Sequence, residues 1–415
     1  MIARNELRKY VDSREFEQVV IRLIGAPIRR IDEIFKPSDL RSKICKVEGN
    51  NGNIILVKIL SKEQPDMFGL SERREEQIAM EHALHEMNLP YARRCLYTDE
   101  RPSCGLKAYF LEWYPNTLEG ILLDESLSKQ QKSEIVKNVI DTYIQFVNEL
   151  NKNTLPIDLP EITEVELRLD SSDAIKKLCM VLYLHERKRQ KTELQALDLL
   201  FQRLEREGYP KATEFEEEGF PSLFGTAEEK LKVHLIPIPN HVLVDQESRK
   251  ISICDLSKIY YAPIELGLAQ LFYYPTFTYV FNFDEIDKFI DYAYEVYCEI
   301  IRGPASKGAG IQKHNFRTRV HTAGTYATLR NITYIVSIMK LILDREGDPT
   351  YETYMKKFKE LQKRHKIYKP ENFLEECRKN VLVRVKSKNI KTFVNRRLYE
   401  LIALSKENGK NQSYQ

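Results

Sequence analysis

The sequence lacks any long uninterrupted apolar run. Its N-terminal residues contain none, and the apolar stretch 332–343 is interrupted by Ser337 and Lys340. A helix that crosses a bilayer needs roughly 18 consecutive apolar residues. We therefore expect a cytoplasmic protein that is not transmembrane. With 415 residues, 42% apolar and 30% charged, the chain has the composition of a soluble globular protein and the length for two or three lobes.

Cysteine also lacks any informative spacing. The seven cysteines are scattered along the chain, and no two of them stand at CxxC spacing. An odd and scattered set argues against a disulfide framework and against a zinc site. We expect reduced thiols, most of them buried.

The charge is unevenly distributed along the chain. The net charge is +3, but residues 356–410 contain 17 Lys and Arg against six Glu, so this segment carries +11 and the rest of the chain −8. Such a tail has the cations to bind a polyanion, either a nucleic acid or an anionic membrane surface. Eight cations between residues 378 and 397 form this candidate surface: Arg378, Lys379, Arg384, Lys386, Lys388, Lys391, Arg396 and Arg397.

The same tail has a second interpretation. Phe393, Leu398, Leu401 and Ile402 recur at helical spacing, which predicts that part of the segment packs on the rest of the protein. Its charged face then simply offsets the acidic body. Phe393 and Tyr399 are positioned to stack on bases if nucleic acid binds, but no recognised nucleic-acid-binding motif is present.

The first part of the chain is rich in strand signals. Residues 29–60 read as three strands, and the Asn50-Asn51-Gly52-Asn53 turn is a strong hairpin signal. Residues 71–88 have the cap and spacing of a helix, and residues 108–114 read as a further strand.

Helical spacing prevails after about residue 126. The predicted helices cover residues 129–151, 172–207, 265–272, 284–302, 322–346 and 351–365, with two more near the C-terminus. The predicted class is therefore α+β, with a small antiparallel sheet followed by a large helical lobe. We expect an N-terminal helical extension (1–28), an N-lobe (29–115), a helical C-lobe (116–350) and a basic helical C-terminal extension (351–415).

A hairpin interrupts the helical part at residues 234–258. Two short apolar runs, in HVLV and ISIC, bracket the polar turn QESRK, and the second run is followed by Asp255. This pattern predicts two buried strands. An aspartate just past a buried strand is placed to hold a metal ion, or alternatively to cap the turn that follows.

This order of elements resembles the kinase-like superfamily, particularly its aminoglycoside-phosphotransferase and lipopolysaccharide-kinase branches, over roughly residues 29–300. The resemblance implies a protein-kinase-like two-lobe fold with ATP and Mg²⁺ as cofactors. Lys58 in VKIL occupies the place of the lysine that pairs with nucleotide phosphates, and Glu76, or less well Glu75, that of the glutamate that orients it. Without the resemblance, both residue types are ordinary solvated side chains.

The resemblance also implies positions for adenine and metal. Residues Glu112, Trp113 and Tyr114 correspond to the hinge whose backbone reads an adenine edge, or they form an ordinary buried strand end. Asp255 and His241 are the candidate metal ligands. The lipopolysaccharide-kinase branch has histidine at the second of these positions, although magnesium prefers oxygen.

Three features depart from the family pattern. The phosphate-covering loop reads KPSDLRSK and contains no glycine, which leaves Ser38 or Ser42 as donors beside a repelling Asp39. Aligning His234 with the first histidine of HxDxxxxN places Ile236 at the catalytic aspartate, and an isoleucine cannot accept a proton.

The third departure concerns the support of that loop. Where the family has DLA, this chain reads GLA, with Gly267 in place of the bracing aspartate. The candidate acids to replace the catalytic one are Asp170, Asp173 and the run Glu216 to Glu218. Sequence alone does not bring any of them to the loop.

Three functional hypotheses remain open. The first is a pseudokinase that binds ATP and Mg²⁺ without the catalytic aspartate and acts by binding a partner protein. The second is a divergent phosphotransferase that phosphorylates a sugar, a lipid or another small-molecule acceptor. The third is a nucleotide-free scaffold that binds a polyanion through the basic tail.

Overall fold

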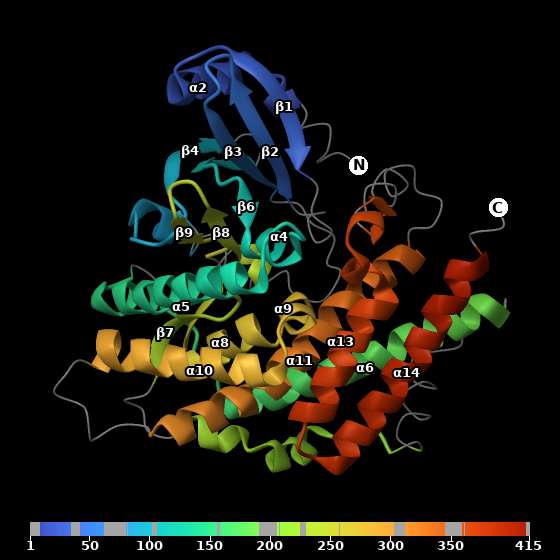
Figure 1. The fold of residues 1–415 in the computed structure, drawn as a ribbon. Coiled ribbons are helices and arrows are strands. Elements are labelled where there is room, and N and C mark those ends of the chain that lie inside the picture. The colour runs from blue at the N-terminus through green and yellow to red at the C-terminus, as the bar shows by residue number, and fades with distance from the viewer. Residues whose placement is uncertain are drawn as a thin grey trace. The chain divides into compact units, whose positions relative to one another are not determined.

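The structure is a computed structural model, in which residues 9–34, 42–61, 80, 82–101, 106–155, 158–190, 206, 208–224, 230–256, 258–302, 312–344, 359–360 and 362–411 are described. Its chain divides into two compact units, which we describe separately (Figure 1). Unit 1 comprises Met1–Asn116, Asn153–Asp158 and Leu243–Lys258, and unit 2 comprises Thr117–Lys152, Leu159–Val242 and Ile259–Gln415.

Unit 1 is built on a five-stranded antiparallel sheet with the order β1-β2-β3-β5-β4. Its strands are β1 (Ile28–Ile34), β2 (Ser42–Gly49), β3 (Ile54–Ser61), β4 (Cys95–Arg101) and β5 (Leu106–Glu112). The hairpin between β2 and β3 turns at Gly52, whose φ of +80° suits glycine. The predicted small antiparallel sheet is therefore confirmed, with β4 as a strand that the sequence did not reveal.

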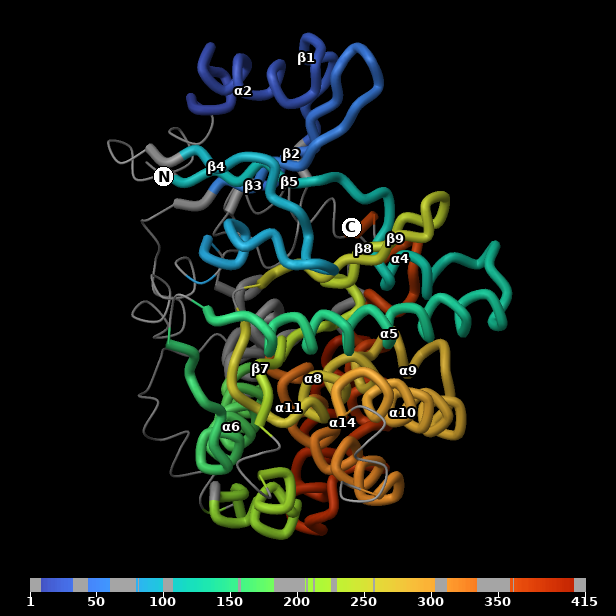
Figure 2. Tube along the Cα trace, turned by 90° about the vertical axis from the view of Figure 1, so that its left-hand side faces the viewer, coloured from blue at the N-terminus to red at the C-terminus, as the bar shows by residue number. Residues whose placement is uncertain are grey.

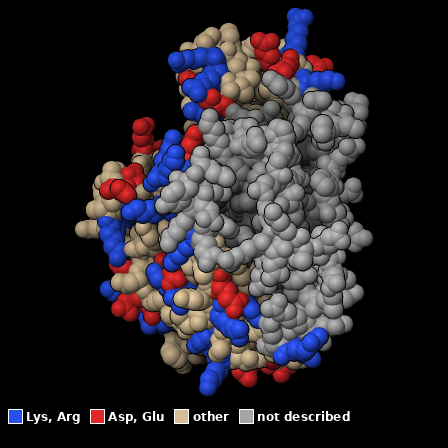
Figure 3. Space-filling model, turned by 90° about the vertical axis from the view of Figure 1, so that its right-hand side faces the viewer, with Lys and Arg blue, Asp and Glu red and all other residues tan. Residues whose placement is uncertain are grey.

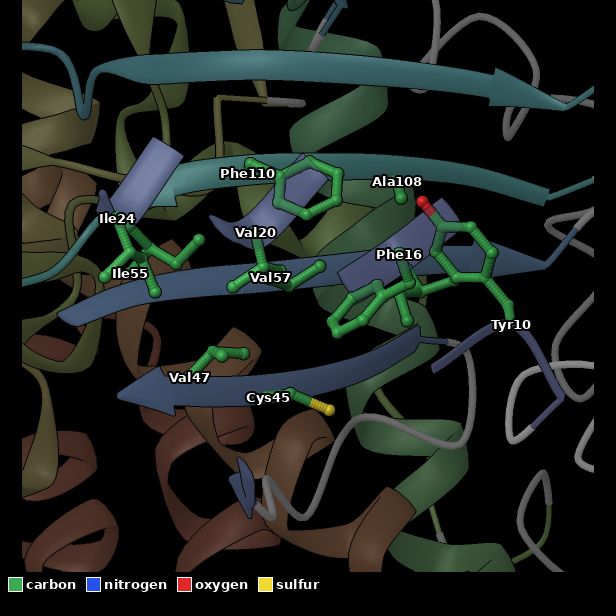
Figure 4. Close-up of a cluster of buried hydrophobic side chains, with 11 residues drawn as sticks. Tyr10, Phe16, Val20, Ile24, Cys45, Val47, Ile55, Val57, Ala108 and Phe110 are labelled. Atoms are coloured by element: carbon green, nitrogen blue, oxygen red, sulfur yellow. The ribbon is translucent and has the colours of Figure 1, made fainter. Parts of the chain in front are cut away.

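One face of this sheet packs against helix α2 (Arg14–Ile24), which Ser13 caps at its N-terminus and Gly25 ends. Phe16, Val20 and Ile24 recur at four-residue spacing and are buried. Figure 4 shows these side chains meeting those of β2, β3 and β5. The sheet residues of this core are Cys45, Val47, Ile55, Val57, Ile59, Ala108 and Phe110.

The opposite face carries a second, smaller apolar cluster. Its buried members are Ile44, Leu56, Tyr109 and Leu111, with Cys95 and Trp113 packed against them. Cross-strand partners lie on the same face of an antiparallel sheet, and Lys58 is paired with Ile44 on β2 and Tyr109 on β5. Lys58 therefore belongs to this second face.

The predicted hairpin is present as β8 (Val242–Asp245) and β9 (Lys250–Ile253). In unit 1 the end of β9 also pairs with the segment before β4, because Ile253 donates to the Tyr91 carbonyl at 2.7 Å and accepts from the Arg93 amide at 2.8 Å. A short strand, β6 (Asn116–Thr117), lies at the boundary of the two units in sequence.

Unit 2 is mainly helical, as the sequence predicts. Its helices are α4 (Leu118–Leu123), α5 (Lys129–Lys152), α6 (Glu164–Gln190), α8 (Ile264–Phe272), α9 (Pro275–Val280), α10 (Phe283–Tyr297), α11 (Lys313–Asp344), α13 (Pro370–Arg384) and α14 (Lys388–Asn411). Strand β7 (Leu231–His234) pairs antiparallel with β10 (Ile259–Ala262). Short 3-10 turns at Ala212–Glu218, Phe220–Phe224, Pro239–His241 and Lys366–Tyr368 and a π turn at Cys298–Arg302 complete the described elements.

Two helices begin earlier than their sequence pattern indicates. Helix α11 starts at Lys313 rather than near residue 322, because Phe316 and Val320 bury a first turn whose other positions are polar. Helix α6 likewise starts at Glu164. In both cases tertiary packing of a few apolar residues extends a helix through a polar stretch.

The basic tail is part of the helical unit. Helix α13 packs on α11 and α14, and α14 contacts α6. Phe393, Leu398, Leu401 and Ile402 are buried, as their helical spacing predicts, whereas Tyr399 is exposed. Within the described residues, no helix combines the length and apolar character that a bilayer crossing requires.

Candidate functional site

Lys58 stands at the edge of the apolar and aromatic face of unit 1. It is half-buried on β3 and shares this face with Leu56 and Tyr109. The predicted partners Glu75 and Glu76 lie outside the described residues. Residues 82–86 are helical, and the His85 ring packs 5.1 Å from the Tyr109 ring.

This arrangement brings residues 82–86, the described part of the predicted helix, to the face that carries Lys58. The pairing of Lys58 with a glutamate stays a prediction. The glycine-free loop, including Ser38 and Asp39, also lies outside the described residues, and Ser42 is the first residue of β2.

Glu112, the first predicted hinge residue, is held by polar contacts within unit 1. Its amide donates to the Arg94 carbonyl at 3.0 Å, and its carbonyl accepts from Arg93 Nε at 2.9 Å. Its carboxylate receives Lys250 Nζ at 2.7 and 2.8 Å. Since the protein already uses its backbone donor, Glu112 is a poorer reader of an adenine edge than the two residues that follow it.

Trp113 and Tyr114 lie in different surroundings. Trp113 packs against the cluster that includes Leu56, and Lys46 Nζ lies 5.1 Å from its ring centroid. Tyr114 is buried against Leu243 of β8 and Cys254, just past β9. The fold of unit 1 thus joins the predicted hinge to the residue that immediately precedes Asp255.

Asp255 adopts a left-handed backbone conformation, with φ of +61°. This conformation is uncommon for a residue other than glycine and costs on the order of 1 kcal/mol or more unless the surroundings enforce it. Such strain concentrates at functional sites. Asp255 is partly exposed, and its carboxylate supplies oxygen ligands of the kind that Mg²⁺ prefers.

The loop from His234 to His241 belongs to unit 2 and is held by its own carbonyl groups. Tyr143 Oη donates to the His234 carbonyl at 2.9 Å. The carbonyl of Ile236 lies 3.1 Å from His241 Nδ1, and that of Ile238 accepts the His241 amide at 2.8 Å. The two prolines of the loop are buried, so this segment is stiff.

The contact with the Ile236 carbonyl also determines the tautomer of His241. A carbonyl only accepts hydrogen bonds, so Nδ1 carries the proton and the neutral ring has its lone pair on Nε2. This tautomer is suited to metal ligation through Nε2. Asp255 and His241 belong to different units, and in the described part of the chain no group of three or more His, Cys, Asp or Glu is arranged to hold a metal.

The acids proposed to replace the catalytic one have other contacts in unit 2. These contacts join Tyr326 to Asp170 at 3.4 Å, Lys176 to Asp173 at 3.2 Å and Arg168 to Glu216 at 3.0 Å. Glu217 is exposed. A catalytic role for any of them stays a prediction.

Glu218 is fully buried in the same unit. Its carboxylate accepts the amides of Lys386 and Ser387 at 2.8 and 2.6 Å and the Thr325 hydroxyl at 3.2 Å. Charge-assisted bonds of this kind fix the turn between α13 and α14. Glu218 therefore has a structural role that explains its conspicuous place in an acidic run.

Most of the eight cations named between residues 378 and 397 are paired with carboxylates. Five of the eight named cations have a carboxylate partner within 4.0 Å: Arg378 with Glu375, Lys379 with Glu376, Arg384 with Asp287, and Arg396 and Arg397 with Glu400. Figure 3 shows one face of the molecule, on which Lys and Arg are interspersed with Asp and Glu in the described part. These cations are thus partly screened by neighbouring carboxylates, three of which belong to the segment and are already counted in its net charge of +11.

Similar chains are found among solved structures. A spectinomycin phosphotransferase, solved in complex with ADP and spectinomycin, is 13% identical, with 82% of this chain and 92% of that chain covered and a TM-score of 0.47. A choline kinase from Cryptosporidium parvum is 13% identical, covering 92% and 90%, at a TM-score of 0.44. A putative aminoglycoside phosphotransferase from Ralstonia eutropha is 9% identical, covering 95% and 98%, at 0.45.

These neighbours are two phosphotransferases, one of them putative, and a choline kinase. At such identities and TM-scores, the similarity carries no conclusion about activity. No protein-family model matches the sequence, and no curated protein matches it either.

Proposed function

We propose that this chain is a kinase-like protein that binds a nucleotide with Mg²⁺, has lost phosphotransfer and acts by binding a partner protein. The observation that carries the proposal is the composition of one sheet face in unit 1. That face combines Lys58 with the aromatic residues Tyr109 and Trp113, and it continues through Tyr114 to the strained Asp255.

Each part of that face suits a different part of a nucleotide. Apolar and aromatic side chains bury a planar base. A lysine neutralises phosphate charge, and a carboxylate supplies an oxygen ligand to the Mg²⁺ that accompanies the phosphates. The backbone of Trp113 and Tyr114 is the candidate reader of the base edge, because the Glu112 amide already donates to Arg94.

The loss of transfer is inferred from the loop in unit 2. Ile236 has no group that accepts a proton or orients a hydroxyl. The loop is stiffened by Pro237 and Pro239 and by the contact between Ile236 and His241. A divergent phosphotransferase with a small-molecule acceptor remains the alternative, and it requires an acid from elsewhere.

The test is a thermal-shift titration of the full chain with ATP and ADP, with and without Mg²⁺. We expect stabilisation of the wild type, its loss in Lys58→Ala, and the loss of its Mg²⁺-dependent part in Asp255→Ala. The matched control is Arg29→Ala, which removes an exposed cation from β1 of the same sheet, where it pairs with Glu48. This control should keep the full shift.

Two results would overturn the proposal. The absence of a thermal shift at millimolar nucleotide would mean that the protein does not bind a nucleotide. An equal shift in Lys58→Ala and the wild type would mean that the nucleotide binds away from Lys58. Conversely, transfer of phosphate from ATP to any acceptor by the wild type would replace the pseudokinase with the divergent phosphotransferase.

Polyanion binding by the basic tail is a second candidate, supported by the +11 charge of residues 356–410. The ion pairs within α13 and α14 weaken it, because paired cations release fewer counterions. Retention on nucleic acid or on anionic vesicles at low salt tests it, with Lys386→Ala/Lys388→Ala as the variant. Retention that this variant does not change would exclude these two lysines.

A further inference from the structure

Gly267 occupies a position where glycine is otherwise unfavourable. It lies in the middle of the fully buried helix α8, where glycine costs about 1 kcal/mol relative to alanine. A Cβ atom at this position would lie 1.8 Å from Tyr143 Oη, 2.9 Å from Tyr143 Cζ and 2.9 Å from the His234 carbonyl oxygen. No side chain fits beside the Tyr143 hydroxyl as it stands.

That hydroxyl has a defined task. Tyr143 is fully buried on α5, and its Oη donates to the His234 carbonyl at 2.9 Å. Two turns further along α5, Asn151 Nδ2 donates to the Lys232 carbonyl at 3.2 Å, and Asn151 Oδ1 accepts the Lys232 amide at 3.0 Å. Helix α5 therefore holds β7 at two points, and Figure 2 shows β7 and α8 beside it.

The hydroxyl also remains a donor at all ordinary pH values. Burial, with the nearby Glu265 carboxylate as a lesser cause, raises the pKa of Tyr143 well above its usual value. Glu265 itself is buried and lies 3.0 Å from Arg319 Nε. The bond to the His234 carbonyl is thus not lost by ionisation of the phenol.

We propose that Tyr143 is the positioning residue of the 234–241 loop, and that its hydroxyl and the glycine at 267 form a matched pair in place of the expected bracing aspartate. The hydroxyl fixes His234 at the start of the loop. The contact between Ile236 and His241 then fixes its end. The position of His241 therefore depends on Tyr143, whether or not a nucleotide binds.

Amide hydrogen exchange of the full-length chain tests the local part of this proposal. Tyr143→Phe keeps the ring and removes the hydroxyl, so the fold is retained. We expect exchange of the amides in residues 233–241 to rise about tenfold, which corresponds to about 1.4 kcal/mol, with little change in α10 or α14.

The matched control for this variant is Tyr292→Phe. This change removes another hydroxyl that α5 receives, since Tyr292 Oη donates to Asp141 at 2.8 and 2.9 Å. Exchange in 233–241 should stay at the wild-type rate. If Tyr143→Phe leaves this exchange unchanged, or raises exchange equally throughout unit 2, the positioning role is wrong.

A double-mutant cycle tests the matched pair. Gly267→Ala alone should lower the melting temperature strongly, because its Cβ and the Tyr143 hydroxyl claim the same volume. The Tyr143→Leu background frees that volume, so Gly267→Ala should lower the melting temperature much less in this background. Equal costs in the two backgrounds would overturn the pairing.

The two proposals fail in different ways. If Tyr143→Phe raises loop exchange but the wild type shows no nucleotide shift, the nucleotide proposal fails and the positioning role stands. If the wild type shows the nucleotide shift but Tyr143→Phe leaves exchange in 233–241 unchanged, the positioning role fails and the nucleotide proposal stands.

Discussion

The two halves of the 234–258 segment differ in what holds them. In the first half, the carbonyls of His234, Ile236 and Ile238 are each bound by a side chain or an amide of unit 2. In the second half, in unit 1, β8 and β9 end in Asp255, whose backbone adopts a strained conformation. Three carbonyls of the first half are held by hydrogen bonds, whereas the second half ends near a partly exposed acid.

This difference separates the part of the segment proposed to bind a ligand from the loop in which phosphotransfer would take place. Strain at a carboxylate persists only where its surroundings enforce it, and it is consistent with a retained ligand contact. A loop with three bonded carbonyls and two buried prolines, and with isoleucine at the position of the acid, is organised for rigidity. The comparison favours a protein that binds a nucleotide and does not transfer its phosphate.

The largest expected effect concerns Asp255. At a nucleotide concentration of 100 times Kd, binding stabilises the native state by about 2.7 kcal/mol, and Asp255→Asn should lose the Mg²⁺-dependent part of this. Asparagine tolerates the left-handed conformation, so stability without ligand should hardly change. Thermal unfolding with and without Mg²⁺ and ATP measures both quantities.

Asp255→Gly provides the control for strain. Glycine adopts φ of +61° without cost, so unliganded stability should rise by about 1 kcal/mol while the Mg²⁺-dependent shift is lost. A drop in unliganded stability would mean that the aspartate caps the following turn, and a retained shift would remove it as a metal ligand.

Unit 2, the helical unit, should lose more stability in acid than unit 1. Burial, and then the charges of Arg384, Arg317 and Lys386, lower the pKa of His321 to about 3. These causes outweigh the attraction of Asp287, 3.2 Å from His321 Nε2. The ring also contacts Tyr273, which ends α8, the helix that carries Gly267.

The direction of this pH dependence follows from the lowered pKa of His321. Below about pH 6.5, His321 binds a proton in the unfolded chain but not in the native state. The free energy of unfolding therefore falls as the pH drops toward 3. Between pH 6.5 and 5 the loss is about 2 kcal/mol at most. Denaturant unfolding at the two pH values should show a smaller loss for His321→Gln. An equal loss in both proteins would mean that other groups cause the acid sensitivity.

The sequence predicted the fold where local signals are strong. Alternation in residues 29–60 and the turn at Gly52 gave three strands with boundaries close to those observed. Helix α5 was predicted almost to the residue, because its apolar face is continuous. Strand β4 and the start of α11 were not predicted, because distant packing rather than local pattern determines them.

The candidate site was predictable in its residues and not in its geometry. Asp255 is recognisable at the end of a buried strand, but its positive φ is not visible in the sequence. Gly267 looked like the loss of a brace, whereas the structure fills its place with Tyr143 from a helix far away in sequence. No spacing rule connects these two residues, so only coordinates reveal that they interact.

A smaller effect is expected at the hinge of unit 1. The pair of Lys250 and Glu112 has short contacts, but the side chains are 51% and 32% exposed, and solvent screens exposed pairs. Glu112→Gln should lower unfolding free energy by about 0.5 kcal/mol. The nucleotide shift should remain, because the Glu112 side chain is not assigned to the ligand. A lost shift would return Glu112 to the binding residues.

The smallest expected effect is that of Ile236→Asp on activity, for which we expect no gain of phosphotransfer. The new carboxylate would stand on a loop stiffened by Pro237, whose Ile236 carbonyl contacts His241, and with no acid at 267 to brace it. Release of ADP from ATP measures this, with Ile236→Asn as the control of equal size. Turnover in the aspartate variant that the asparagine variant lacks would show that the loop kept its catalytic geometry, and that only the base had been lost.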